Sequence, residues 1–107
     1  MSIEGFQRKY LRGLAHNHKA VTQIGRQGLT SEAIQSVRAA LEDHELVKVS
    51  MHKPKDKKAM AAELAVRTES ELCGLIGHTV ILYRAHSEAP VIRLPQRPTP
   101  STDDSSP

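Results

Sequence analysis

A glycine turn with an arginine at its tip, Gly25-Arg26-Gln27-Gly28, lies between a short apolar run and an amphipathic segment. Glycine allows backbone conformations and close approaches that a β-carbon would block. The segment that follows, Ser31–Asp43, has helical periodicity, and a helix N-terminus offers unpaired N–H groups and a positive dipole end. The pattern favours binding of phosphate. A tight strand-to-helix connection without a ligand is the alternative that this motif alone leaves open.

The same turn supplies specific candidate contacts. We predict that the backbone N–H groups of Gly28 and Leu29 donate to a phosphate. The Arg26 guanidinium can make the two parallel hydrogen bonds to phosphate that a lysine cannot copy. Thr30 is predicted to cap the helix, with Glu32 in the first turn where the helix dipole favours an acid.

Other basic residues form two groups that would extend such a surface. One group lies on a predicted first helix over residues 3–15, opposite its apolar stripe, and continues to Lys19 beside the turn; the other is the loop His52–Lys58. Both patterns are also typical of ordinary solvated surfaces, and the sequence does not guarantee that the second group reaches the side of the turn. The candidate contacts in the two groups are Arg8, Lys9, Arg12, Lys19, Lys53, Lys55, Lys57 and Lys58.

No catalytic or metal-binding constellation accompanies these residues. The six histidines show no paired spacing on one helix, and the single cysteine excludes an intrachain disulfide and a multi-cysteine zinc site. His16-Asn17-His18 falls within one short connection, without the longer ββα-metal element of the nucleases that use His and Asn. Cys73 lies in an apolar run and is predicted to be a core residue. We therefore expect no enzyme activity, no metal and no cofactor.

Composition limits the class of protein further. With 107 residues and a formal net charge of +3, the chain has room for one domain with a mildly basic surface. It holds no Trp, one Phe and two Tyr, so stacking of bases on aromatic side chains cannot be the main recognition device. The chain shows neither a signal-peptide core nor an apolar run of membrane-spanning length, and we expect a cytoplasmic protein.

Hydrophobic periodicity predicts the elements that position these residues. Strand–helix–strand units of this length favour right-handed parallel crossovers, and Gly77-His78 is predicted to close a final antiparallel hairpin. The expected fold is α+β, a four-stranded mixed sheet packed against three helices in the order α-β-α-β-α-β-β. The domain is predicted over residues 1–95, followed by a disordered Pro/Ser/Asp tail over 96–107. The predicted elements are residues 3–15, 20–24, 31–43, 46–51, about 57–68, 72–76 and 79–83.

Apolar residues at helical spacing predict which side of each of the three helices packs against the sheet. The stripe of the second helix is predicted to run from Ala33 to His44. In the third helix, capped by Asp56, Met60 and Leu64 are predicted to face inward. The stripe of the first helix is predicted to be Ile3, Phe6, Tyr10, Leu11 and Leu14.

Four ordered segments resemble the YhbY-type proteins, which are stand-alone bacterial members of the CRM (chloroplast RNA splicing and ribosome maturation) domain family. The resemblance covers roughly residues 3–95 with very few gaps. One Gly-x-x-Gly motif is a weak signal, whereas four blocks in order are specific. The segments are Leu11-Arg12-Gly13-Leu14-Ala15-His16, Gly25-Arg26-Gln27-Gly28-Leu29-Thr30, Ala40-Leu41-Glu42-Asp43-His44-Glu45-Leu46-Val47-Lys48-Val49 and Ile76-Gly77-His78-Thr79-Val80-Ile81-Leu82-Tyr83-Arg84.

The resemblance implies a fold like the C-terminal domain of translation initiation factor three. It also implies RNA binding through the Gly-x-x-Gly loop, here Gly25–Gly28, and association with precursors of the large ribosomal subunit and their rRNA. In the plant relatives the domain serves group II intron splicing. The segment His52–Lys58 follows the family only loosely, so contacts there depend on charge. A monomer is the simpler expectation, and a protein–protein adaptor whose basic face docks an acidic partner is the alternative.

Overall fold

The computed structural model describes residues 3–18, 20, 22–86, 88 and 90–96. Its elements follow the predicted order α-β-α-β-α-β-β, which is therefore confirmed. Lys19 and residues 97–107 of the predicted tail lie outside the described residues. The elements are α1 (Gly5–Ala15), β1 (Thr22–Ile24), α2 (Ser31–Asp43), β2 (Leu46–Met51), α3 (Lys57–Arg67), β3 (Glu71–Ile76) and β4 (Thr79–Tyr83).

The four strands form one mixed sheet in the order β1-β2-β4-β3. β1 pairs with β2 in parallel, as the β1–α2–β2 crossover requires, and the other two pairings are antiparallel. The predicted four-stranded mixed sheet is thus confirmed. β4 occupies the interior of the sheet, and β1 and β3 form its two edges.

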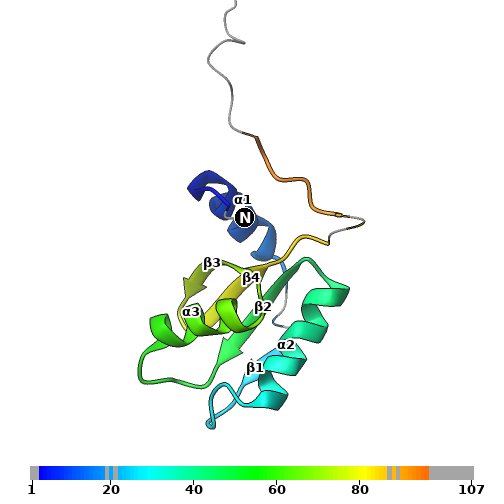
Figure 1. Ribbon diagram of the computed structural model, residues 1–107. Helices are drawn as coiled ribbons and strands as arrows, with labels where there is room; N and C mark the ends of the chain where they lie inside the picture. The colour runs from blue at the N-terminus through cyan, green and yellow to red at the C-terminus, as the bar shows by residue number, and fades with distance from the viewer. Residues whose placement is uncertain (1–2, 19, 21, 87, 89, 97–107) are drawn as a thin grey trace, which may run out of the picture.

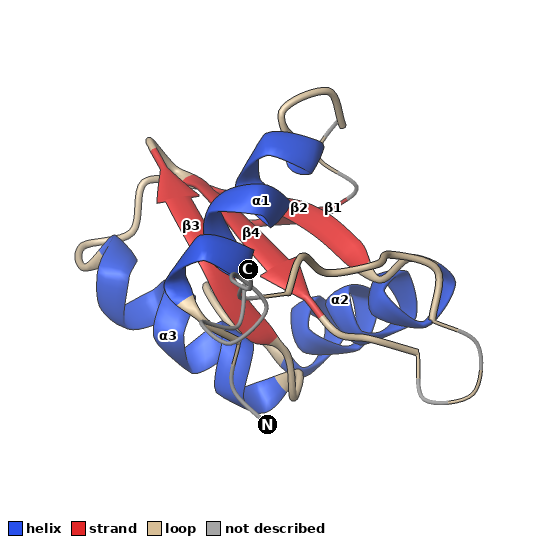
Figure 2. Cartoon of the chain, turned by 90° about the horizontal axis from the view of Figure 1, so that it is seen from above, coloured by secondary structure: helices blue, strands red, loops and turns tan. Residues whose placement is uncertain are grey.

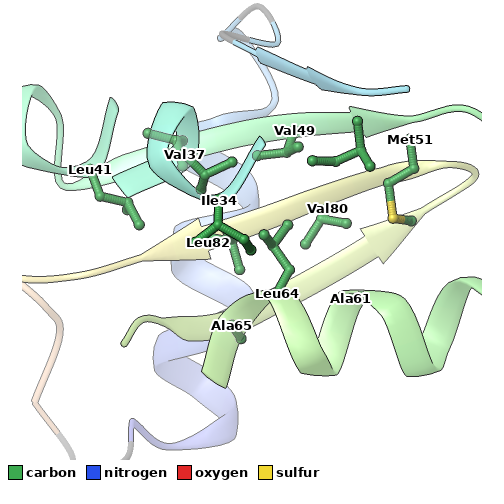
Figure 3. Packing of buried hydrophobic residues seen from close by; sticks show 12 residues of the cluster. Ile34, Val37, Leu41, Val49, Met51, Ala61, Leu64, Ala65, Val80 and Leu82 are labelled. Atoms are coloured by element: carbon green, nitrogen blue, oxygen red, sulfur yellow. The ribbon is translucent and has the colours of Figure 1, made fainter. Parts of the chain in front are cut away.

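Helices cover both faces of the sheet. Figure 1 and Figure 2 show α2 and α3 on one face and α1 on the other. The larger core lies between the sheet and α2 and α3, where alternate strand residues such as Val49 and Leu82 meet Leu41 and Leu64 (Figure 3). This alternation is the period of two that the sequence of β2 predicted.

A smaller core lies beneath α1. Leu11 and Ala15 of α1 are fully buried there against Ile81 of β4 and Cys73 of β3. Cys73 is 2% exposed, which confirms its prediction as a core residue. Burial raises the pKa of the Cys73 thiol to about 12, and the negative charge of Glu71 acts in the same direction.

The helix caps form as predicted. The Thr30 hydroxyl oxygen accepts a hydrogen bond from the Ala33 N–H at 3.1 Å, and an Asp56 carboxylate oxygen accepts from the Ala59 N–H at 3.1 Å. Each cap satisfies one of the N–H groups that the first helical turn leaves without a partner.

Three local predictions need correction. Tyr10 is 42% exposed, because the sheet meets α1 along Leu11 and Ala15 and leaves the edge of the predicted stripe in solvent. His44 is exposed in extended backbone (φ −138°) after α2 has ended, so it does not continue the stripe of that helix. Ala20 is exposed and precedes β1, which begins at Thr22.

Candidate nucleic-acid interface

The glycine turn connects β1 to α2 at one end of the sheet (Figure 1). The Gly28 N–H donates to the Gly25 carbonyl oxygen at 3.1 Å and closes the turn. Gly28 has φ +76°, a conformation that favours glycine. A β-carbon on Gly25 would meet nothing within 4 Å. The backbone conformation thus demands glycine at position 28, whereas at position 25 glycine leaves open space beside Arg26.

Of the two backbone N–H groups predicted to donate to a phosphate, only one is available in this structure. The Gly28 N–H is used inside the turn, so it is not available to a ligand in this conformation, contrary to the prediction. The Leu29 N–H has no hydrogen-bond partner among the described residues and stays a predicted donor. The next N–H groups of the chain open α2, where the dipole of the helix favours an anion.

Parallel pairing brings the lysine loop beside the glycine turn. Ile24 and Met51, the last residues of β1 and β2, are register partners, and the His52 N–H donates to the Ile24 carbonyl oxygen at 2.8 Å. The turn of the β3–β4 hairpin joins them, because the Met51 N–H donates to the His78 carbonyl oxygen at 2.8 Å. We call this part of the molecule the loop end. It comprises residues 25–29, 52–58 and 77–78.

A groove of about 570 Å³ separates the two basic loops of the loop end. The residues of the glycine turn line one side, His52–Lys55 lines the other, and Ala59 and Met60 of α3 contribute as well. A second depression, of about 460 Å³, lies between the turn and the first residues of α2 and reaches Gln23 of β1. The turn therefore borders a hollow on each side.

Most cations of the loop end have no protein partner in the described part of the chain. Arg26, Lys53, Lys55 and Lys58 are exposed, and none of their side chains forms a hydrogen bond or ion pair within the described part of the chain. Lys57 differs, because its Nζ donates to the Gly77 carbonyl oxygen at 3.0 Å. Lys53 has φ 27°, a region that favours glycine, so the loop holds a lysine at the expense of some backbone strain.

The acids near the groove are already engaged. Asp56 caps α3, and a Glu63 carboxylate oxygen lies 3.5 Å from Arg67 Nη1 one helical turn away. An acid that holds its own partner opposes an incoming phosphate less than a free one does. The electrostatic character of the groove is therefore set by the unpaired cations.

The basic residues of α1 are not brought to the loop end. α1 lies on the opposite face of the sheet from α2 and α3 (Figure 2). Arg8 Nη1 donates to the Ile3 carbonyl oxygen and Arg12 Nη1 to the Cys73 carbonyl oxygen, both at 2.8 Å, so these half-buried guanidinium groups support the packing of α1. Lys9 is exposed. RNA contacts by these three residues stay predictions that the geometry of the loop end does not support.

Glu45, just before β2, has a role that the sequence analysis missed. It is 3% exposed, and its carboxylate accepts hydrogen bonds from the N–H groups of His86 (2.7 Å), Val91 (2.9 Å) and Ile92 (2.5 Å). Burial raises the pKa of this carboxyl, but the three backbone hydrogen bonds outweigh burial and hold the pKa below its ordinary value. In the sequence, nothing marks Glu45 for this role except that it is an acidic residue between a predicted helix and a predicted strand.

These hydrogen bonds fasten a C-terminal segment that we call the strap, residues 90–96. Ile92 and Leu94 pack against the smaller core, and Gln7 Nε2 of α1 donates to the Pro95 carbonyl oxygen at 3.1 Å. A cavity of about 510 Å³ lies beside the strap, between the end of α2 and the start of β2. The predicted domain boundary near residue 95 thus falls at the end of a segment that is packed.

The described residues contain neither a metal-binding cluster nor a membrane-spanning helix. Within residues 3–18, 20, 22–86, 88 and 90–96, no group of three or more His, Cys, Asp or Glu side chains could hold a metal ion. In that same part of the chain, no helix has the length and apolar character needed to cross a membrane.

Residues 3–84 match the model of the CRS1/YhbY (CRM) domain. The chain belongs to this family. It is 35% identical over 95 residues to the "Probable RNA-binding protein YqeI" of Bacillus subtilis, covering 87% of this chain and 99% of the relative. It is 36% identical over 93 residues to an "RNA-binding protein" of Haemophilus influenzae, covering 85% of this chain and 93% of the relative.

A solved structure has the same fold. The solution structure of the hypothetical protein SAV1595 from Staphylococcus aureus superposes with a TM-score of 0.77 at 39% sequence identity. The match covers 87% of this chain and 99% of the other. The resemblance noted in the four sequence segments is thus confirmed as membership of the CRM family.

Proposed function

We propose that this CRM protein binds RNA at its loop end and acts on precursors of the large ribosomal subunit in the bacterial cytoplasm. The observation that carries the proposal is the groove between the glycine turn and the lysine loop. Around it, Arg26, Lys53 and Lys55 have no partner among the described residues. The names of the curated relatives support RNA as the ligand. The large-subunit role follows from the resemblance to the YhbY-type proteins.

The chemistry of the groove favours recognition of the RNA backbone. Arg26 can hold a phosphate through two hydrogen bonds, while Lys53 and Lys55 act as point charges on the opposite side. The open space beside Gly25 allows a phosphate to approach the backbone, and the Leu29 N–H is available to it. The residues that line the groove include no Phe, Tyr or Trp, so base stacking has no such platform there.

Sedimentation of cell lysate on a sucrose gradient tests the proposal. The wild-type protein is compared with Arg26→Glu and with Arg93→Glu, a control that makes the same charge change in the strap. We expect wild type and the control to travel with precursors of the large subunit and Arg26→Glu to stay at the top of the gradient. Each purified variant is first shown to unfold cooperatively with the melting temperature of the wild-type protein.

Three outcomes would contradict parts of the proposal. If the wild-type protein does not sediment with ribosomal particles, the assembly role is wrong. If it also fails to bind purified RNA, the protein–protein adaptor is the better interpretation. Arg26→Glu that sediments like wild type removes the glycine turn as the contact. Equal loss by both variants would mean that general basicity, not the groove, holds the RNA.

A further inference from the structure

One row of side chains crosses all four strands on the α1 face near the loop end. Gln23 of β1 is the register partner of Ser50 in β2, Ser50 is the partner of Thr79 in β4, and Thr79 is the partner of Ile76 in β3. Their neighbours Ile24, Val49, Val80 and Leu75 all pack into the larger core on the other face. Because successive strand residues point to opposite faces, the four side chains share the α1 face. We call them the polar strip.

The polar strip is not covered by α1. The residues of the smaller core beneath that helix, such as Leu46 and Tyr83, lie toward the far end of β2 and β4. Seen from above, α1 crosses the sheet and leaves the end of β3 clear (Figure 2). Gln23 is exposed, Ile76 is 61% exposed, and Ser50 and Thr79 are half-buried. This part of the sheet face is open.

The polar groups of the strip have no partners in the described part of the chain. The Gln23 amide and the Ser50 and Thr79 hydroxyls form no side-chain hydrogen bond there, although most hydroxyls in a half-buried position find one. Together they offer donors and acceptors without net charge. Ile76 adds an apolar contact at the edge of the sheet.

The strip lies at the same end of the sheet as the proposed RNA site. Ser50 precedes His52 of the groove by two residues, and Thr79 directly follows the hairpin turn of the loop end. An RNA held at the loop end would meet the strip where it passes over this end of the sheet to the α1 face. An uncharged row beside a cationic groove is suited to sugars and bases, because phosphates are better held by the cations.

We propose that the polar strip contacts the ribose 2′-hydroxyls of the RNA held at the loop end and so makes the protein prefer RNA to DNA. The inference rests on the proposed function, since the loops must first hold the backbone. The 2′-hydroxyl both donates and accepts hydrogen bonds, which matches hydroxyl and amide side chains. The cations of the groove attract the phosphates of either nucleic acid, whereas a contact to the 2′-hydroxyl is available only with RNA.

The test compares two probes, a fluorescein-labelled stem-loop RNA from large-subunit rRNA and the DNA stem-loop of the same sequence. The strip variant carries Gln23→Ala, Ser50→Ala and Thr79→Val, of which the last keeps the β-branched shape. Ser50→Ala alone is the milder variant, should the triple change disturb folding. Gln35→Ala, an exposed glutamine of α2 outside both hollows, is the matched control.

We expect the strip variant to lose about tenfold in affinity for the RNA probe and almost nothing for the DNA probe. Its salt dependence should equal that of wild type, because no phosphate contact has been removed. Arg26→Glu should instead weaken binding of both probes and flatten the salt dependence. Gln35→Ala should bind both probes like wild type.

The outcomes separate the two ideas. A ratio of RNA to DNA affinity that is the same in wild type and the strip variant, or a wild type without any preference for RNA, overturns the role of the strip and leaves the loop-end site standing. A wild type that binds neither probe, or an Arg26→Glu variant that binds both unchanged, overturns the loop-end site itself.

Discussion

The charged residues at the two ends of β2 differ in burial and in hydrogen bonding. Glu45, just before the strand, is buried and accepts three backbone hydrogen bonds from the chain around the strap. Lys53 and Lys55, just after it, are exposed without a partner in the described part of the chain, as is Arg26 beside them. A buried charge must be satisfied by the protein, whereas an exposed one is satisfied by water and can exchange that water for a ligand.

The contrast separates stability from binding along a single strand. We expect changes at Glu45 to alter the free energy of unfolding and to leave RNA affinity intact. Changes at the loop end should do the reverse. Variants at the two ends of β2 can therefore confirm or refute this separation.

Reversal of charge at the loop end should have the largest effect. The double variant Arg26→Glu, Lys53→Glu is expected to lose at least about a hundredfold in RNA affinity at low salt, because two phosphate contacts become repulsive. Fluorescence anisotropy over a range of salt concentrations measures it. The comparison variant Lys9→Glu, Arg93→Glu makes the same charge change on α1 and the strap, and an equal loss there would break the contrast.

Replacement of Glu45 should act on stability. Glu45→Gln keeps the shape but loses the charge, and we expect the free energy of unfolding at pH 7 to fall by about 1–3 kcal/mol. The folded-state pKa of Glu45 is lowered, so its stabilisation is present above the unfolded pKa of about 4.3 and is lost as the pH falls through the folded pKa. Urea denaturation from pH 7 to pH 3 should therefore show a shallower decline for the variant. An identical decline would refute this role.

Substitutions of the two glycines of the turn should separate stability from RNA affinity, with smaller effects. Gly28→Ala is expected to cost about 1 kcal/mol of unfolding free energy, because φ +76° disfavours any side chain. Gly25→Ala should leave thermal stability unchanged, because its methyl group would meet no atom of the described residues within 4 Å apart from its two chain neighbours. It should nevertheless weaken RNA binding. Equal RNA affinity in Gly25→Ala would show that no ligand approaches the backbone there.

Removal of the tail beyond the strap should have the smallest effect. Removal of residues 96–107 is expected to leave the melting temperature unchanged, because that part of the sequence has no apolar periodicity. Removal of residues 90–107 should lower it, since Ile92 and Leu94 leave the smaller core and Glu45 loses two donors. A large drop with the shorter deletion would show that the tail itself docks on the domain.

Local signals in the sequence were sufficient for most of the fold. Thr30 and Asp56 were recognisable as caps because their side chains satisfy N–H groups only a few residues away. The alternation of Val47, Val49 and Met51 identified a strand with one buried face. Each of these signals depends on neighbours in the chain, which is why they could be interpreted without knowledge of the tertiary structure.

Arg12 shows where such reasoning fails. The helical projection placed it on a solvent-facing basic surface, yet its side chain crosses Gly74 of β3 and donates to the Cys73 carbonyl oxygen. A β-carbon on Gly74 would lie 2.6 Å from Arg12 Cδ, so the missing side chain on the strand makes room for the arginine. Such a contact joins residues far apart in the chain, and periodicity within one helix cannot predict it.

The sequence by itself determined which segments become helices and strands, where α2 and α3 begin, and that a glycine turn with an arginine precedes α2. The tertiary structure decided what these parts do together. Because β1 and β2 run in parallel, their last residues meet and the loops that follow them enclose one groove. The pairings of β2 with β1 and with β4 place Gln23, Ser50 and Thr79 in one row. The sequence predicted the parallel crossover and the final hairpin, but the order of the strands and the residues that become partners across them depend on contacts between distant residues, which periodicity within one element does not supply.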